Sequence, residues 1–167
     1  MMRFLTRWRV TLGFFFAIGV LWLARPTARS LIIGAIVAII GESLRVWAAG
    51  HLEKSKEVTM SGPYRYTRHP LYLGSSLIGI GMVIVANNQI VAVIVIVYLI
   101  LTLTAAMRSE EAHLREKFGD AYDAYAEKRA PRIERAFSWQ RALYNREHHT
   151  IFGLAAGLLA LWLKGYW

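Results

Sequence analysis

Residues 71–107 read LYLGSSLIGIGMVIVANNQIVAVIVIVYLILTLTAAM, two apolar runs joined by Asn87, Asn88 and Gln89. A helix needs about 20 apolar residues to cross a bilayer, and the runs 71–86 and 90–107 approach that length. So short and uncharged a connection predicts a helical hairpin whose tip faces away from the cytoplasm. The two ends of the hairpin that lie opposite the turn, which we call its feet, are then expected on the cytoplasmic side, where loops rich in Lys and Arg belong.

The composition of the whole chain favours the same membrane-embedded class. The chain has 167 residues, 56% of them hydrophobic, and a formal charge of +9. The charges lie beside the apolar runs, where basic residues would contact anionic membrane lipids. This position argues against a nucleic-acid partner. Cysteine is absent, which excludes disulfides, thiolate catalysis and cysteine-bound metals. We expect no metal site and no obligate protein partner.

Further apolar runs predict the remaining architecture. Residues 4–24 and 30–50 are expected to form the first two spans, and residues 150–163 form either a short fifth span, which we favour, or an interfacial helix. Residues 110–128 predict an amphipathic cytoplasmic helix, interrupted at Gly119 with Asp120 capping its second piece. The expected fold class is therefore all-α, a polytopic helical membrane protein with five transmembrane helices. A single domain covers residues 1–167, and the expected location is a bacterial inner (cytoplasmic) membrane.

The two feet of the hairpin carry the polar residues that point to chemistry. The first foot is residues 64–72, within the stretch 62–74 that reads GPYRYTRHPLYLG, and the second foot is residues 108–111, which read RSEE. A helix that starts just after Pro70 directs its positive N-terminal end toward the first foot, while the second foot offers two carboxylates. Such a pair of feet could hold a zwitterionic ligand. Adjacent residues on a helix point about 100° apart, so only one of Glu110 and Glu111 would face it, and the other would pair with an arginine, Arg108 or Arg115.

Glu42 and Arg45 form a second candidate within the run 30–50. Their i, i+3 spacing puts both on one helix face, close enough to pair. One interpretation is an ion pair that holds helices together, and the other is a substrate-facing pair, because ionisable groups at membrane depth are commonly functional.

The combination of these motifs resembles a known family. GPYRYT followed by RHPLYLG, the downstream EEAHLREKFGDAYDAYAEKRAPRI and the LRVWA of residues 44–48 are similar to the isoprenylcysteine carboxyl methyltransferase and phospholipid methyltransferase family. The resemblance covers about residues 41–133. It says nothing about the apolar run 150–163.

This resemblance implies an integral membrane enzyme that binds S-adenosylmethionine at its cytoplasmic face, without a Rossmann domain, and methylates a lipophilic acceptor. The residues implied to contact the cofactor are Tyr64, His69, Pro70, Tyr72, Gly74, Glu110 and Glu111. Arg45 would lie toward the acceptor with Glu42 beside it, and the acceptor would enter from the bilayer near these two residues. Its reacting group stays open, because Glu42 favours an amine whereas Arg45 favours a carboxylate.

Two other classes of protein remain as alternatives. A membrane reductase of the sterol-reductase type would bind NADPH beside its membrane helices instead of S-adenosylmethionine. A non-enzymatic lipid-binding protein would carry His69, Glu110 and Glu111 only as surface polar residues.

Overall fold

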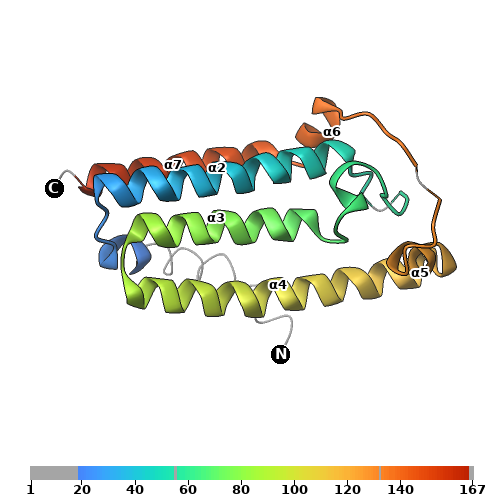
Figure 1. Ribbon diagram of the computed structural model, residues 1–167, viewed down its shortest axis with the longest axis horizontal. Helices are drawn as coiled ribbons and strands as arrows, with labels where there is room; N and C mark the ends of the chain where they lie inside the picture. Colours follow the sequence, from blue (N-terminus) through green and yellow to red (C-terminus); the bar gives the residue numbers. More distant parts are fainter. Residues whose placement is uncertain (1–18, 55, 132, 166–167) are drawn as a thin grey trace.

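The computed structural model describes residues 19–54, 56–131 and 133–165 (Figure 1). Within these ranges the chain is helical and has no strand, which confirms the all-α class. The elements are α2 (Ala28–His51), the 3-10 helix η1 (Gly62–Arg65), α3 (Pro70–Ala86), α4 (Gln89–Phe118), α5 (Asp120–Ala126), α6 (Trp139–Tyr144) and α7 (Glu147–Gly165). Most of the predicted first span, residues 4–24, lies outside the described residues.

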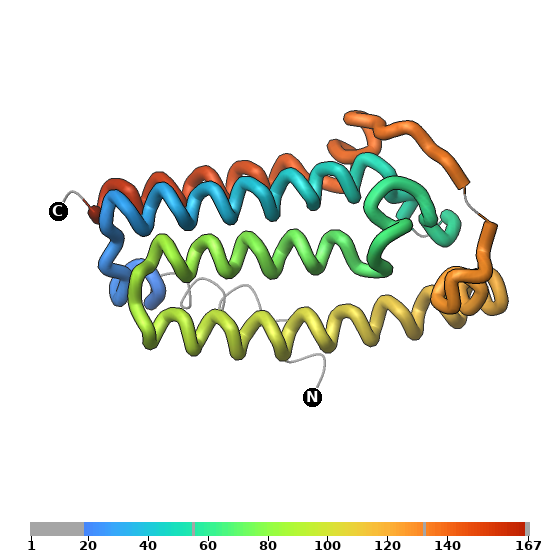
Figure 2. Tube along the Cα trace, in the orientation of Figure 1, coloured from blue at the N-terminus to red at the C-terminus, as the bar shows by residue number. Residues whose placement is uncertain are grey.

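The predicted hairpin is formed by α3 and α4, which run antiparallel from a shared turn (Figure 2). Asn87 ends α3 in a left-handed conformation with φ 46°, which asparagine tolerates better than most residues. Asn88 caps α4, because its side chain accepts hydrogen bonds from the backbone N–H groups of Ile90 at 2.9 Å and Val91 at 3.2 Å. The two asparagines therefore reverse the chain within three residues.

Small residues let α2 and α3 pack closely. A Cβ atom built on Gly41 would lie 2.7 Å from the carbonyl oxygen of Gly74, and one on Gly81 would lie 2.6 Å from the carbonyl oxygen of Gly34. Helices that pack within apolar surroundings commonly meet at such glycines, since the backbones can then approach each other directly. This contact fixes the position of Arg45, which lies one turn beyond Gly41.

Two helices, α2 and α4, are long and apolar enough to cross a membrane, and α3 is a shorter apolar helix of 17 residues. Large apolar side chains stay exposed along α4, where Val93 and Leu101 keep 63% and 65% of their surface accessible. Such a surface is expected of a helix that faces lipid. By length and hydropathy the described residues thus supply two candidate spans, fewer than the five predicted. The last apolar run lies in α7, which extends along α2 (Figure 1).

Helix α4 does not end where the apolar run ends. It continues through the charged residues to Phe118, about 16 Å beyond Met107 at the rise of an α-helix. Gly119, with φ 47°, then breaks the helix as predicted. Gly119 is the N-cap of α5 and Asp120 is its first helical residue, so the predicted capping role of Asp120 is wrong. The carboxylates of Glu110 and Glu111 consequently lie on a continuous helix that also forms the hairpin.

Candidate active site

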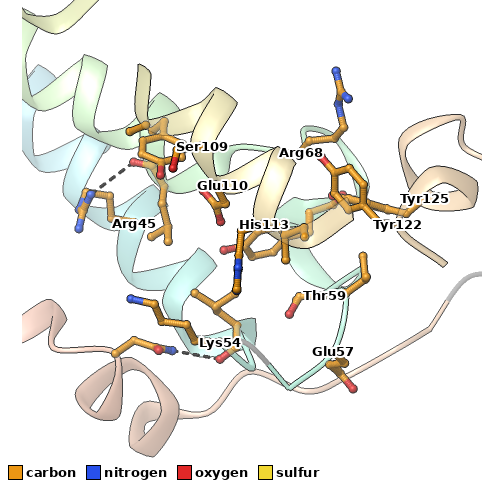
Figure 3. A pocket seen from close by; sticks show the side chains of 18 of the residues that line it. Arg45, Lys54, Glu57, Thr59, Arg68, Ser109, Glu110, His113, Tyr122 and Tyr125 are labelled. Carbon is orange, nitrogen blue, oxygen red and sulfur yellow. Dashed lines mark hydrogen bonds between the residues drawn. The ribbon is translucent and has the colours of Figure 1, made fainter. Parts of the chain in front are cut away.

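A polar cavity of about 650 Å³ lies where the hairpin of α3 and α4 opens, between residues of the loop before α3 and of the α4 extension. Figure 3 shows its lining side chains from close by. Segments far apart in the sequence meet around it, from the end of α2, the loop before α3, the α4 extension, α5 and the start of α7. Its lining residues are Arg45, Leu52, Lys54, Glu57, Val58, Thr59, Tyr64, Arg68, Leu71, Tyr72, Ala106, Ser109, Glu110, His113, Leu114, Tyr122, Tyr125, Asn145 and Glu147.

Four of the residues singled out in the sequence line this cavity: Arg45, Tyr64, Tyr72 and Glu110. The other five lie beside it. Pro70 is the buried first residue of α3 and fixes where that helix begins. Gly74 touches the backbone of Gly41 and the side chain of Arg45. His69, Glu111 and Glu42 also stand outside the lining.

Glu110 and Glu111 point in different directions, because adjacent residues on an α-helix project about 100° apart. Glu110 lies in the cavity wall, whereas Glu111 binds the first foot through His69, whose Nε2 lies 2.8 Å from its Oε1. Arg68 is the second partner of Glu111, at 3.4 Å. The predicted pairing of this carboxylate with Arg108 or Arg115 is therefore replaced, and Arg115 instead donates to Asp123 at 2.9 Å. The bridge from His69 to Glu111 joins the two feet of the hairpin.

Tyrosines form one wall of the cavity. The ring of Tyr64 is buried, and the hydroxyl of Tyr125 donates to the backbone carbonyl of Tyr64 at 2.8 Å. Tyr122, which is 1% exposed, completes this wall from α5. Burial raises the pKa of Tyr64 and raises the pKa of Tyr125 to about 12. These phenols accordingly stay neutral at physiological pH.

Arg45 sits at the centre of a network that joins three helices. Its guanidinium binds Glu147 of α7 through two hydrogen bonds, from Nε to Oε2 at 3.2 Å and from Nη2 to Oε1 at 2.9 Å. The remaining donors reach the Ser75 hydroxyl at 2.6 Å, the Leu71 carbonyl at 3.4 Å and the Thr150 hydroxyl at 3.3 Å. All of its hydrogen-bonding directions are thus used within the chain.

Glu42 pairs only weakly with Arg45. The nearest approach joins Oε2 of Glu42 and Nε of Arg45 at 3.9 Å, which is longer than a hydrogen bond. Glu42 is buried, and within the described part of the chain neither of its oxygens has a hydrogen-bond partner. Arg45 therefore stands between two carboxylates and is bound mainly by the one from α7.

Sequence reasoning missed several cavity residues. Glu147 stands between a basic connector and an apolar run, and its only signal is that it is the one acidic residue in the sequence after Glu134. Lys54 and Arg68 lie in loops among other charged residues, and Tyr122 and Tyr125 lie within the predicted amphipathic segment 110–128, so no local pattern marks these four as site residues. All four residues line the same cavity as Glu110 and His113. In Figure 3 the Arg68 guanidinium is directed away from Glu110 and His113.

An apolar groove of about 560 Å³ borders the polar cavity along the outside of α3 and α4. Its lining residues are Thr67, His69, Tyr72, Leu73, Ser76, Ile80, Ile96, Leu99, Ile100, Leu103, Thr104 and Met107. Tyr72 belongs to both linings. This side chain therefore separates a polar space from an apolar one.

The sequence of the chain was compared with known families and proteins. Residues 8–121 match the family model of the phospholipid methyltransferases. The chain belongs to this family. The match includes both feet of the hairpin and ends within α5, so α6 and α7 lie beyond it.

Several relatives fit this assignment. The chain is 31% identical over 108 residues to a probable protein-S-isoprenylcysteine O-methyltransferase of Oryza sativa subsp. indica, which covers 58% of this chain and 56% of the relative. It is 28% identical over 88 residues to the protein-S-isoprenylcysteine O-methyltransferase of Schizosaccharomyces pombe, covering 53% and 37%.

Another relative carries a different description. The chain is 29% identical over 107 residues to the nickel-cobalt-cadmium resistance protein NccN of Alcaligenes xylosoxydans xylosoxydans, covering 63% of this chain and 48% of the relative. The chain thus spans about half the length of these relatives or less. No solved structure matches it significantly.

Proposed function

We propose that this protein is an integral membrane methyltransferase that transfers a methyl group from S-adenosylmethionine to a lipophilic acceptor dissolved in the membrane. The observation that carries the proposal is the polar cavity between the two feet of the hairpin, bordered at Tyr72 by the apolar groove. Its volume is within the usual range of small-molecule sites, about 300–1,000 Å³. Membership of a methyltransferase family supports the reaction class.

The lining residues suit the chemical groups of S-adenosylmethionine. The carboxylate of Glu110 would hold the ammonium group, and the cations of Lys54 and Arg68 would hold the carboxylate. Tyr72 and Tyr125, which line the cavity and are partly exposed, would offer aromatic faces to the adenine. Bound there, S-adenosylmethionine supplies an activated methyl group on a sulfonium.

The contribution of the protein to such a transfer is placement. An in-line displacement needs the nucleophile on the attack line and water kept away, and it needs little acid or base work when the acceptor is already nucleophilic. Tyr64 and Tyr122 close one side of the cavity with buried rings. The His69–Glu111 bridge keeps the Glu110 face of α4 turned toward this wall. We propose that His69, Pro70, Gly74 and Glu111 support cofactor binding through this arrangement.

We infer the route of the acceptor by comparing the space on the two sides of α3. Near Arg45 and Glu42, where the sequence suggested an entry, the start of α7 occupies the space and binds the arginine. The apolar groove on the other side is open, and its end meets the cavity at Tyr72. We therefore propose that the hydrocarbon part of the acceptor lies in the groove, and that its amine or carboxylate head group passes Tyr72 toward Arg45.

Calorimetry on the detergent-purified protein tests the cofactor. We expect S-adenosylhomocysteine to bind and NADPH to give no heat. Binding of NADPH alone would instead support a reductase, and failure to bind either would support a lipid-binding protein and overturn the enzyme proposal.

The acceptor is identified by transfer of a labelled methyl group. Dodecylamine and N-acetyl-S-farnesylcysteine are suitable first probes, since one presents an amine and the other a carboxylate on a long apolar chain. We expect label in the organic phase with one of them. The site of attachment then shows whether the product is an N-methyl or an O-methyl compound, and no incorporation into either would contradict the proposed acceptor classes.

A further inference from the structure

Glu147 is buried, with 5% of its surface exposed, and it belongs to the first turn of α7. A carboxylate in such surroundings is expected to have a cationic partner, because an isolated buried charge is costly. Its partner is Arg45, 102 positions earlier in the chain. This contact joins the family-like part of the chain to a helix that lies beyond the family match.

Arg45 and Glu147 form a bidentate pair, which is the strong geometry for a guanidinium and a carboxylate. Two parallel hydrogen bonds hold the plane of the guanidinium to the plane of the carboxylate, which fixes orientation as well as distance. Both residues line the polar cavity. Glu42 offers the competing carboxylate, at 3.9 Å, and is outside the cavity lining. The guanidinium thus has two carboxylates within reach, and only one of them lies at the cavity.

We infer that Glu147 is a positioning residue, which holds Arg45 at the cavity wall and away from Glu42. Without the carboxylate of Glu147, the guanidinium would lose its main anionic partner, which is costly in a buried site. We expect it to turn toward Glu42, the other carboxylate within 4 Å. The positive charge of Arg45 would then lie at a different position relative to the bound acceptor. Helix α7 is, by this reasoning, a part of the catalytic unit. The inference rests on the proposed function because it assigns Arg45 to the acceptor end of that site.

The central variant is Glu147→Gln, which keeps size and shape but removes the charge. We expect kcat/KM for the acceptor to fall about 100-fold, the cost of a misplacement near 1 Å at a reacting centre. Affinity for S-adenosylhomocysteine should change less than about threefold, because Glu110, Lys54 and Arg68 are untouched. His149→Gln is the matched control, since His149 is exposed two residues away. It should leave turnover and binding unchanged.

Two further variants separate positioning from simple stabilisation. Glu147→Asp keeps the charge with a shorter reach, and we expect it to recover part of the turnover. In an Arg45→Lys background, Glu147→Gln should lower kcat/KM only slightly further, because both changes act through the same guanidinium. Additive losses, or loss of thermal stability with an unchanged kcat/KM for the folded protein, would overturn the inference.

Failure of the inference can be told from failure of the proposed function. If the unaltered protein binds no S-adenosylhomocysteine and methylates neither dodecylamine nor N-acetyl-S-farnesylcysteine, the proposed function falls and the inference falls with it. If the unaltered protein is active and Glu147→Gln has the same kcat/KM for the acceptor, only the inference falls. A direct readout is the arginine Nε–H resonance of ¹⁵N-labelled protein. That signal should shift in Glu147→Gln and stay unshifted in His149→Gln.

Discussion

At the scale of single residues, the site depends on which way each of two adjacent carboxylates points. Glu110 lies in the cavity wall, whereas Glu111 is held by His69 and Arg68. The sequence predicted that only one of them would face a ligand, but it did not choose between them. The choice depends on the rotation of α4 relative to α3, which the hairpin packing determines.

Glu110→Gln should weaken binding of S-adenosylhomocysteine about 10- to 100-fold, because a charged hydrogen bond of about 1.5–3 kcal/mol is lost. Glu111→Gln should weaken it less, since that carboxylate acts through His69. Isothermal titration measures both. Glu116→Gln, an exposed change on the same helix, is the control and should bind as the unaltered protein does. A larger loss in Glu111→Gln than in Glu110→Gln would contradict the assignment.

The tyrosine wall predicts a dependence of stability on alkaline pH. An unfolded tyrosine has a pKa of about 10, whereas burial raises the pKa of Tyr125 to about 12. Below pH 10 both states are protonated and stability is full. As the pH rises from 10 toward 12 the unfolded state loses its proton first, so the free energy of unfolding falls. Thermal unfolding in detergent between pH 8 and 11.5 measures this fall.

Tyr125→Phe should reduce the slope of that fall, because the variant has one fewer group to titrate. It should also lower stability at neutral pH by about 1 kcal/mol, the usual net value of a hydrogen bond such as the one to the Tyr64 carbonyl. Equal slopes for the variant and the unaltered protein would show that Tyr125 titrates alike in both states.

At the scale of elements, close packing of α2 on α3 sets the place of the polar residues. Gly41 and Gly74 bring the two backbones together one turn from Arg45. The resemblance implied that Gly74 touches the cofactor. In the structure its neighbours are Gly41 and Arg45, and we propose that it supports the site through the close approach of the two helices.

Gly74→Ala tests this contact. Its added methyl group would meet the Gly41 carbonyl at 2.7 Å and Arg45 Cγ at 2.5 Å, so the helices must shift. We expect a loss of about 1–3 kcal/mol in stability, as in other overpacked interiors. Gly153→Ala is the control, because nothing lies within 4 Å of its added methyl group. A loss of equal size in both variants would contradict the packing role, and unfolding experiments in detergent provide the comparison.

At the scale of the whole molecule, the turn between α3 and α4 lies at one end, and the end of α2, the loop before α3 and α5 lie at the other (Figure 1). Residues of these last three segments line the polar cavity. The two long apolar helices and the family indicate a membrane protein. Its orientation is a proposal: the positive-inside rule places the cavity end, with its basic loops, in the cytoplasm.

The chain has no cysteine, so single-cysteine variants report topology without background. Gln89→Cys at the exposed hairpin tip should react with an impermeant maleimide in intact cells. Glu116→Cys near the cavity end should react only after the membrane is permeabilised. The reverse pattern would place the site on the outer face.

Local patterns in the sequence determined the all-helical class, the hairpin, the break at Gly119 and the two feet that carry the polar motifs. These features depend on residues close together in the chain, such as consecutive apolar residues, paired asparagines and a glycine in a left-handed conformation. Four of the nine predicted site residues line the cavity for the same reason, because they lie in those motifs.

Only the tertiary structure decided the partner of Arg45, the partner of Glu111 and the packing of α7 against α2. Each of these depends on helices far apart in the sequence, and the rotation of one helix against another leaves no periodic signal in either. Glu147 shows this most clearly. A lone carboxylate between a basic connector and an apolar run gains its meaning only when the packing of α7 brings it to the arginine of α2.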